Sequence, residues 1–583
     1  MAGAVGRWNP RACGDRRCGL VLVVVLVMIA LLALLAAAYS FMVRAHVQTV
    51  MSNYYVFQAR QAADSGLQRA LVLLQQSRGD PESWFDNPDE FQHLLVYGTE
   101  GSDNVEERSD AERFDPTANA AWRVNLVHPD YDNRDKILYG LTDEGSRLNL
   151  NTATEAQIRR LFEAAIPNDA DHEVDIDVLV DSLFDWREPG NRARPHGAKD
   201  EYYFSLRPPY RAKKGSFATV DELLLVRGFT GWVLFGEDYN RNGLLDPNED
   251  DGDTSFPPDD ADGELFVGVA PFLTVWSAEA NVSNDNRPRI NLNMEDTQKL
   301  QELLQDDFSS EIVSYVMQVR SSGMQFNSVM NLIPAPPKPE TEEEEPPEED
   351  PGATTQPATS QPDSEADNRK PEGNENDNSD SGQAPPTDNG SADEPPVPAP
   401  PPLPEYRDLT EEPPPGMADD LPLILDRLTV APLPLLPGRI NVTTAPREVL
   451  SAIEALTLED VDAIIAARKN LDGAATATPA WLVTEGTIDL YTFRRIVDGI
   501  TTSSVMYRIE AVGYADHVGV VQRMMTVVDI SALVMPQFSQ AFLGAGARPP
   551  GAQVLYQQDL TPLGVAYNPY GEEKRGLADR SGK

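Results

Sequence analysis

The hydrophobic pattern of the chain is dominated by one long apolar run near the N-terminus. No charged side chain occurs from Leu20 to Val43, and the first one after the run is Arg44. A helix of this length, at about 1.5 Å per residue, spans a hydrocarbon core of about 30 Å. The run therefore predicts a single membrane-spanning helix, and an ordinary uncleaved signal anchor would show the same pattern.

Apolar residues continue at helical spacing beyond this run. They lie four and then three positions apart at Val50, Tyr54 and Phe57, and the same spacing repeats at Leu67, Leu71 and Leu74. Gly79 and Pro81 then end the pattern. We therefore expect one helix over residues 20–78, with a membrane-spanning first half and an amphipathic second half that needs a domain to cover it.

Alternating apolar and polar residues predict β-strands on either side of a long middle region of the chain. Residues 121–128 and 136–141 form one β-like pair, joined by turn-forming residues, and residues 505–512 and 520–530 form another. If the two pairs share one sheet, everything between them is inserted. The fold class that we predict is α+β, with the long helix lying on a small antiparallel sheet.

A short pattern recurs in the middle of the chain and predicts small helical lobes. Apolar residues and asparagine alternate at 148–151, 290–293 and 440–442, each time before a segment with helical periodicity. Thr152 and Glu155 fit a capping box for the first of these helices. Second helices are expected at 178–183, 312–316 and 461–465. Such lobes resemble helix-hairpin-helix or SAM-like modules.

Two segments have compositions that do not suit a packed core. Residues 334–396 contain no Val, Ile, Leu, Met or aromatic residue and are rich in Pro, Glu, Asp, Ser and Asn. We expect residues 334–416 to be a disordered linker between the second and third lobes. The tail 536–583, rich in Gly, Pro and Gln, is expected to be flexible.

The net charge of the chain limits the classes of molecule that it is expected to bind. The 583 residues include 48 basic and 93 acidic ones, which gives a net charge of −45. Such a chain repels nucleic acid and attracts cations. Both cysteines, Cys13 and Cys18, precede Gly19, so a chain cut after Gly19 would have no disulfide framework.

The most specific chemical motif is an acidic loop from Asp238 to Glu249. It fits the calcium-loop pattern D-x-[DN]-x-[DN]-G-x5-E at every defined position. The expected ligands are the side-chain oxygens of four residues, a backbone carbonyl and a closing bidentate carboxylate, because calcium takes six to eight oxygens. In order they are Asp238, Asn240, Asn242, Leu244, Asp246 and Glu249. We predict a structural Ca²⁺ ion, the alternative being a solvated acidic turn.

Catalysis has little support in the sequence. The sequence contains no H-E-x-x-H, G-x-S-x-G or Walker pattern. Asp181, Asp185 and Glu188 could suggest paired carboxylates, but their helical spacing favours a solvated face with Trp186 turned to the core. We expect no enzyme, no catalytic residues and no organic cofactor.

The N-terminus resembles those of type IV pilins and pseudopilins. A leader containing Arg7, Arg11, Arg16 and Arg17 ends in Gly19, directly before the apolar run. The resemblance implies that a prepilin peptidase cuts between Gly19 and Leu20 and that the new N-terminus is methylated. Most members carry Glu at the fifth mature position, where this chain has Val24.

Residues 181–228 carry a more specific resemblance. After Leu148–Ala153 come, in order, Asp185-Trp186, Gly197–Tyr203, Pro208–Tyr210, Phe217–Leu223 and Val226–Gly228. This order is similar to that of type II secretion system protein K, a minor pseudopilin lineage without the Glu and with a large helical domain inserted into its pilin sheet. The resemblance covers roughly residues 17–330 and, more weakly, 420–530, and members of the family bind calcium.

The resemblance implies a function and a location. The protein would cap the tip of a type II secretion pseudopilus, support its assembly and so support export of folded proteins across the outer membrane. Its partners would be other minor pseudopilins, the prepilin peptidase and the bacterial inner membrane, with secreted proteins or the outer-membrane secretin as further candidates and no nucleic acid. It would cross the membrane once, with a short cytoplasmic N-terminus and a periplasmic domain. The alternatives are a membrane-anchored calcium-binding scaffold or adhesin, and a DNA-uptake pseudopilin.

The predicted domain boundaries follow from these patterns. They are a leader at 1–19, the N-terminal helix at 20–78, the first part of the pilin-like sheet at 79–147, a first lobe with the calcium loop at 148–289, a second lobe at 290–333, the linker at 334–416, a third lobe at 417–504, the last pilin strands at 505–535 and the tail at 536–583.

Overall fold

The computed structural model describes most of the chain outside its two ends and the Pro/Glu-rich segment. The described residues are 16–77, 79–98, 121–131, 134, 136–167, 174–252, 254–257, 259–333, 417–515, 519–535, 551–564 and 567. Residues 1–15 of the predicted leader, the predicted linker and much of the predicted tail therefore lie outside the described residues.

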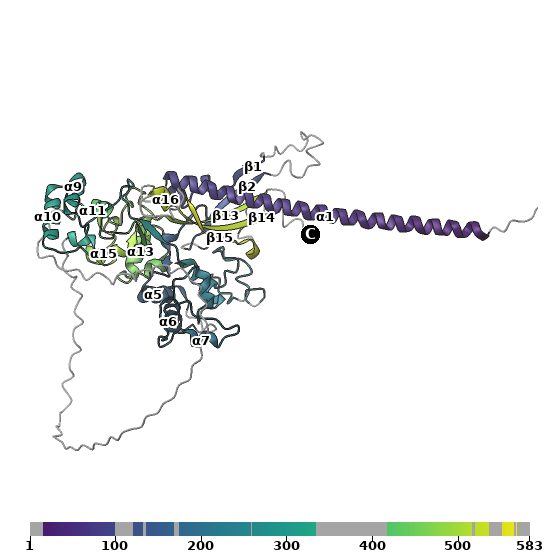
Figure 1. Ribbon diagram of the computed structural model, residues 1–583, viewed down its shortest axis with the longest axis horizontal. Coiled ribbons are helices and arrows are strands. Elements are labelled where there is room, and N and C mark those ends of the chain that lie inside the picture. Colours follow the sequence, from purple (N-terminus) through teal and green to yellow (C-terminus); the bar gives the residue numbers. More distant parts are fainter. Residues whose placement is uncertain are drawn as a thin grey trace, which may run out of the picture. The chain divides into compact units, whose positions relative to one another are not determined.

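One continuous helix, α1 (Arg16–Ser77), opens the described chain. Its apolar first part is fully exposed and has a mean hydropathy of 3.3, which fits a single membrane span. Burial begins at Ala59 and recurs along one face at Ala62, Ala63 and Ala70. These small side chains let the sheet come close, because a Cβ at Gly513 would lie 2.0 Å from the Ala59 carbonyl oxygen. Figure 1 shows the sheet strands along this C-terminal half of α1.

The sheet has the strand order β1-β2-β13-β14-β15, with short β3 and β4 at its side. Its central strands are β2 (Trp122–Pro129), β13 (Met506–Ala515) and β14 (Val521–Asp529), and all their pairings are antiparallel. Strands from the two ends of the chain thus share one sheet, as the sequence predicts. The predicted α+β class, a long apolar helix with an antiparallel sheet, is confirmed.

The remaining elements near the sheet are short. They are α2 (Pro81–Trp84), α3 (Pro88–Phe91), β1 (Leu94–Tyr97), β3 (Ile137–Leu138), β4 (Thr142–Asp143), α16 (Ser531–Val534), β15 (Gln553–Asp559) and the 3-10 helix η8 (Thr561–Leu563). The prediction of a flexible tail is wrong for β15, which pairs with β14 from Met524 to Asp529. Two β-favouring residues, Val554 and Tyr556, lie in this strand among glutamines that obscure the pattern.

The inserted region is built from short helices and strands. The first part holds η2 (Glu144–Ser146), β5 (Leu148–Asn149), α5 (Glu155–Ala165), α6 (Ile176–Arg187), α7 (Asp200–Phe204), η3 (Val220–Leu225), α8 (Gly231–Phe235), η4 (Ala270–Phe272), β6 (Leu273–Thr274) and β7 (Ala278–Ala280). The second part holds β8 (Ile290–Asn291), α9 (Thr297–Asp307), α10 (Ser310–Ser321), η5 (Val329–Leu332), α11 (Leu421–Arg427), β9 (Leu428–Thr429) and β10 (Leu435–Pro437). The last part holds β11 (Ile440–Asn441), α12 (Arg447–Ser451), α13 (Leu458–Arg468), α14 (Trp481–Thr484), α15 (Leu490–Ile496), η6 (Val497–Gly499) and β12 (Ile500–Thr501).

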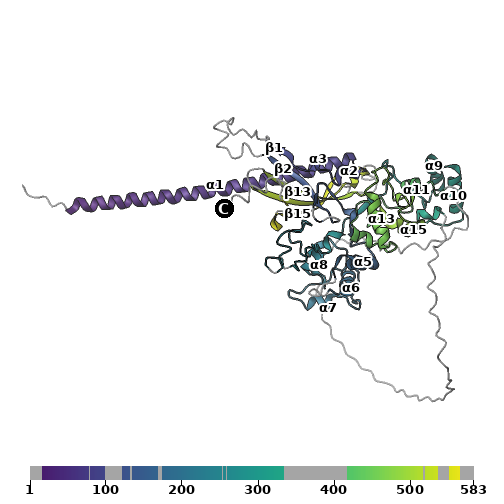
Figure 2. The same cartoon turned by 180° about the vertical axis from the view of Figure 1, so that it is seen from behind.

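The sequence repeat corresponds to a structural repeat. Each apolar-Asn pair is a two-residue strand that pairs in parallel with a later apolar-Thr pair: β5 with β6, β8 with β9 and β11 with β12. The asparagine then turns the chain, since its side-chain oxygen accepts the backbone N–H two residues on, at 2.9 Å for Asn149 and for Asn291 and 3.0 Å for Asn441. Each lobe is thus opened and closed by the same small ladder. In both views α5 and α6 group together, as do α9 and α10 (Figures 1 and 2).

Each lobe is also fastened by an arginine near the end of its second helix. Arg187 donates to the carbonyl of Leu150 at 2.6 Å, Arg320 to that of Met294 at 3.1 Å, and Arg468 to that of Ala445 at 2.6 Å. In every lobe the acceptor lies just after the opening strand. In each lobe an arginine therefore satisfies a backbone carbonyl of the turn that follows the opening strand.

The structure corrects two local predictions. The closing strand of the second lobe, β9, follows the predicted linker in sequence, so residues 334–416 interrupt the sequence of the second lobe and do not separate the second lobe from the third. Residues 417–429 belong to the second lobe because only they supply a partner for β8 among the described strands. The first helix is capped by Thr154 with Gln157, not by Thr152 with Glu155, because the chain turns for two more residues before α5.

Candidate functional site

The predicted calcium loop is folded around its own side-chain oxygens. The Asp238 carboxylate accepts the backbone N–H groups of Asn242 and Gly243 at 2.9 and 2.8 Å. The Asn240 side-chain oxygen also accepts the Asn242 N–H, at 3.0 Å. Gly243 allows the turn because its φ is +70°, a conformation that side chains disfavour. The first half of the loop thus wraps around Asp238.

The second half of the loop folds back onto the first. One Asp246 carboxylate oxygen accepts the side-chain amides of Asn240 and Asn242 at 2.6 and 2.9 Å. The Glu249 carboxylate accepts the backbone N–H groups of Tyr239 and Asp246 at 3.1 and 3.2 Å. The side chains expected at loop positions one, three, five, nine and twelve are therefore brought together.

Burial makes the two end carboxylates costly to ionise. Asp238 and Glu249 are only 4% and 1% exposed. Burial raises the pKa of Asp238 to about 6. Burial also raises the pKa of Glu249 to about 7, and the neighbouring Asp238 and Asp246 carboxylates add to the effect. A cation placed among these groups would favour their charged forms.

The donor set fits a hard cation only if amide and backbone oxygens join the carboxylates. Among the described residues, no three His, Cys, Asp or Glu side chains gather closely enough to hold a metal ion by themselves. Asn240 and Asn242 point their amide nitrogens at Asp246, and a half-turn of each amide would present oxygen instead. With Leu244 supplying a carbonyl, these oxygens would suit Ca²⁺. The calcium site stays a prediction.

A buried arginine of the sheet holds the loop from outside. Arg523 on β14 is 2% exposed and donates to the backbone carbonyls of Asn240 and, at 2.7 Å, Arg241. Its Nε also pairs with Glu510 on β13. On the same side, the Gly243 backbone packs on Pro129 at the end of β2, where a Cβ would lie 2.5 Å from the proline ring. The loop is therefore joined to the pilin-like sheet.

Sequence reasoning did not identify Arg523 as part of the site. It is separated from the loop by the second and third lobes, and a lone arginine in a strand carries no local signal. Its burial between an acid and two carbonyls is visible only in the fold.

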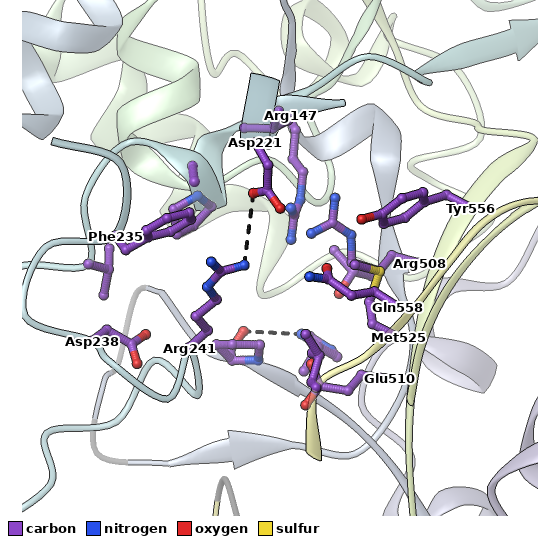
Figure 3. A pocket seen from close by; sticks show the side chains of 18 of the residues that line it. Arg147, Asp221, Phe235, Asp238, Arg241, Arg508, Glu510, Met525, Tyr556 and Gln558 are labelled. Carbon is purple, nitrogen blue, oxygen red and sulfur yellow. Dashed lines mark hydrogen bonds and ion pairs between the residues drawn. The ribbon is translucent and has the colours of Figure 1, made fainter. Parts of the chain in front are cut away.

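A cavity of about 110 Å³ adjoins the loop (Figure 3). Asp238 and Arg241 line it from the loop, and Arg508, Met525 and Tyr556 line it from β13, β14 and β15. Arg241 pairs with Asp221 at 3.8 Å and lies 3.7 Å above the Phe235 ring. The cavity is thus bounded by the first lobe on one side and by the sheet on the other.

The acidic residues around Asp185 have a structural role. Asp185 and Asp181 are buried, and they accept the backbone N–H groups of Arg194 and His196 at 3.0 and 2.9 Å. The prediction that these carboxylates form a solvated face is wrong, because they hold the loop after α6. Trp186 does point to the core, with its Nε1 donating to Glu222 at 2.7 Å.

The predicted processing residues lie at the start of the described chain. Gly19 and Leu20 belong to α1 and are far in sequence from the loop, so the structure does not bring them together with the predicted calcium ligands. Cleavage between them stays a prediction.

Comparison with known proteins agrees with the resemblance noted in the sequence. Residues 138–234 match the family model of type II secretion system (T2SS) protein K. No curated protein matches the chain in sequence. A solved structure, the GspK-GspI-GspJ complex from enterotoxigenic Escherichia coli, has a chain with 10% identity and a TM-score of 0.31, over 88% of this chain and 99% of that one. The family model therefore carries the assignment.

The matched region extends from β3 through α5, α6, α7 and η3 to α8, so it contains the buried motif around Asp185 and ends just before the calcium loop. It supports a minor pseudopilin role in type II secretion. Over these residues the chain is similar to type II secretion system protein K.

Proposed function

We propose that the protein caps the tip of a type II secretion pseudopilus, supports its assembly and so supports export of folded proteins across the outer membrane. The observation that carries the proposal is the match of residues 138–234 to the protein K family model. The chain would act by binding other minor pseudopilins, with a structural and not a catalytic role.

The N-terminal helix supports the proposed position at the tip. A subunit that lies beneath another in a pseudopilus needs a buried carboxylate to neutralise the N-terminal amine above it, because an unpaired charge is costly in lipid. Val24, the fifth residue after the proposed cut, has no charge to supply. A subunit with nothing above it has no such need.

The inserted region supports the same position. The lobes emerge between β4 and β13, which pair with each other through Tyr507 and Asp143, and they contribute most of the buried core of the described chain. A domain of this size attached to the pilin-like sheet would obstruct stacking of another subunit on top.

Calcium would be a structural cofactor in this proposal. The loop from Asp238 to Glu249 would hold the ion, and Arg523 would transmit the order of the loop to the pilin-like sheet. Extracytoplasmic calcium sites with dissociation constants of about 0.1–1 mM are still filled.

We expect the chain to be inserted once in the bacterial inner membrane, with the prepilin peptidase acting at its cytoplasmic end and the domain in the periplasm.

A secretion assay tests the proposed role in type II secretion. Deleting the gene in the native bacterium should retain type II substrates in the periplasm, and the intact gene should restore their release. Photo-crosslinking tests the contacts with partner subunits. A photo-crosslinker can be placed at either of two exposed positions of α1, Phe57 or, further along the helix, Val72. Crosslinks to other minor pseudopilins support the proposal, and normal secretion by the deletion strain contradicts it.

A further inference from the structure

The cavity beside the loop contains a buried arginine that has one nitrogen without a hydrogen-bond partner. Arg147 lines the cavity, is 3% exposed, and its Nη1 has no hydrogen-bond partner among the described residues. Leaving a buried guanidinium N–H unpaired is costly, so the position favours an acceptor from outside the chain.

The acids around the cavity are already engaged. Asp221 pairs with Arg241, Glu510 with Arg523, and Glu144 with Arg508 at 2.6 Å. Asp143 lies next to this group, but its carboxylate accepts the Gly145 N–H and the side chains of Asn441 and Thr444. The Asp238 carboxylate accepts N–H groups of its own loop. Arg147 thus forms no ion pair within 4.0 Å in the described part of the chain, and the nearby acids that attract it, Glu144 and Asp143, are also bound to other groups.

Several polar groups lie near Arg147 at the same end of the cavity. In Figure 3 the guanidinium groups of Arg147 and Arg508 are neighbours, and the Tyr556 hydroxyl and the Gln558 amide point toward them. The two guanidinium groups repel each other, and Glu144, which pairs with Arg508 and also attracts Arg147, supplies only one negative charge for both. A planar carboxylate matches the paired N–H groups of arginine.

Apolar side chains also line the cavity. Met525, Trp276, Val220 and Ala270 contribute to it, together with the Tyr556 ring, which stacks on Trp276 with centroids 5.4 Å apart. A volume of about 110 Å³ accommodates a body of a few carbon atoms.

We propose that this cavity binds a small organic carboxylate, with the carboxylate between Arg147 and Arg508 and the apolar body against Met525 and Trp276. Such a ligand would join the first lobe to the sheet, because Arg147 precedes β5 and Arg508 belongs to β13. The inference does not depend on the proposed role at the pseudopilus tip.

Benzoate is a suitable probe, and benzamide is its neutral isostere. With the full mature chain in detergent, at fixed calcium, benzoate should bind and raise the melting temperature, whereas benzamide should bind at least 10-fold more weakly. A second arm compares a short peptide that ends in phenylalanine with its C-terminally amidated form. Binding of the free peptide alone would mean that a polypeptide C-terminus can supply the same carboxylate.

Gln558→Glu is the decisive variant. It places a carboxylate beside Arg147 and Arg508, so the protein should become more stable without ligand and should lose benzoate binding by at least 10-fold. Gln557→Glu is the matched control, because Gln557 is exposed on the other face of β15, and it should bind benzoate like the unchanged protein. Arg147→Gln should also lose binding.

The proposal is overturned if benzoate does not bind, if benzamide binds equally well, or if Gln558→Glu binds benzoate as the Gln557→Glu control does. The comparison of Gln558→Glu with Gln557→Glu remains decisive even if Arg147→Gln fails to fold, so the test does not depend on that variant.

Discussion

Arg523 on the pilin-like sheet donates from Nη2 to the backbone carbonyl of Arg241, in the predicted calcium loop, at 2.7 Å. The same guanidinium donates to the carbonyl of Asn240 and pairs with Glu510, so its donors face a carboxylate on one side and loop carbonyls on the other. Lysine could not replace this arrangement because it lacks the planar fork. The buried Arg523 side chain therefore joins the predicted calcium loop of the inserted region to the sheet.

Replacing Arg523 should destabilise the protein strongly. Arg523→Gln leaves the partly buried Glu510 carboxylate and two loop carbonyls without the buried Arg523 as their partner, and breaking a buried pair costs about 3–5 kcal/mol. Chemical denaturation of the mature chain measures the loss. Arg69→Gln is the control, because Arg69 pairs with Glu90 at the surface, where an ion pair is worth about 0–1 kcal/mol. Equal effects of the two variants would contradict the anchoring role of Arg523.

Calcium should raise the melting temperature through the Asp238 loop. A ligand that binds only the folded protein stabilises it by about 2.7 kcal/mol at 100 times its dissociation constant. Glu249→Gln removes the closing carboxylate and should abolish the difference between melts in calcium and in EDTA, and Asn242→Ala should reduce it less. In EDTA the Glu249→Gln variant should be at least as stable as the unchanged protein, because a buried charge has been removed.

The matched control for calcium is Glu264→Gln, the same substitution at an exposed position outside the loop. It should keep the full calcium effect. If the unchanged protein melts identically in calcium and in EDTA, the loop is only an acidic turn.

His128 should make stability depend on pH in mildly acidic solution. Burial lowers the pKa of His128 below 6.5, so the native state favours the neutral ring. The unfolded chain then binds the proton more tightly, and stability is lost as the pH falls below 6.5 through the native-state pKa. His128→Gln should flatten this part of the profile, measured as unfolding free energy from pH 7.5 to 5 at constant calcium. A variant with an unchanged slope would show that His128 does not contribute.

Proteolysis should cut first within residues 334–416, as the composition of that segment predicts. The two fragments should nevertheless elute together from a sizing column, because β8 pairs with β9 and β2 with β13 across the cut. Deleting 334–396 should change the melting temperature little. Fragments that separate in native buffer, or a large loss of stability after the deletion, would contradict this account.

The elements that sequence patterns predicted well are those with a strong period or a fixed motif. The apolar run became α1, and the alternating segments became β2, β13 and β14 in one sheet. The second helices of all three lobes also lie where apolar spacing placed them, at α6, α10 and α13. Local periodicity is enough for such elements because burial of one face decides them.

The features that sequence reasoning missed depend on contacts between distant segments. A two-residue strand such as β9 has no period of its own, so nothing in residues 428–429 shows that they close the lobe opened at Ile290. β15 is a strand because β14 offers it an open edge. Asp181 and Asp185 are spaced as a solvated face would be, yet the returning loop at Arg194 buries them. The predicted calcium ligands were found from a sequence motif, whereas Arg523 and the cavity at Arg147 are visible only in the fold.

The most direct test of the pseudopilin account is the mass of the mature N-terminus of the membrane-bound protein. The basic leader and the uninterrupted apolar run predict a chain that begins at Leu20 with a methylated amine, and a bulky residue in place of Gly19 should block the cut. A protein that begins at Leu20 supports the account. A membrane-bound protein that still begins at Met1 or Ala2 contradicts it.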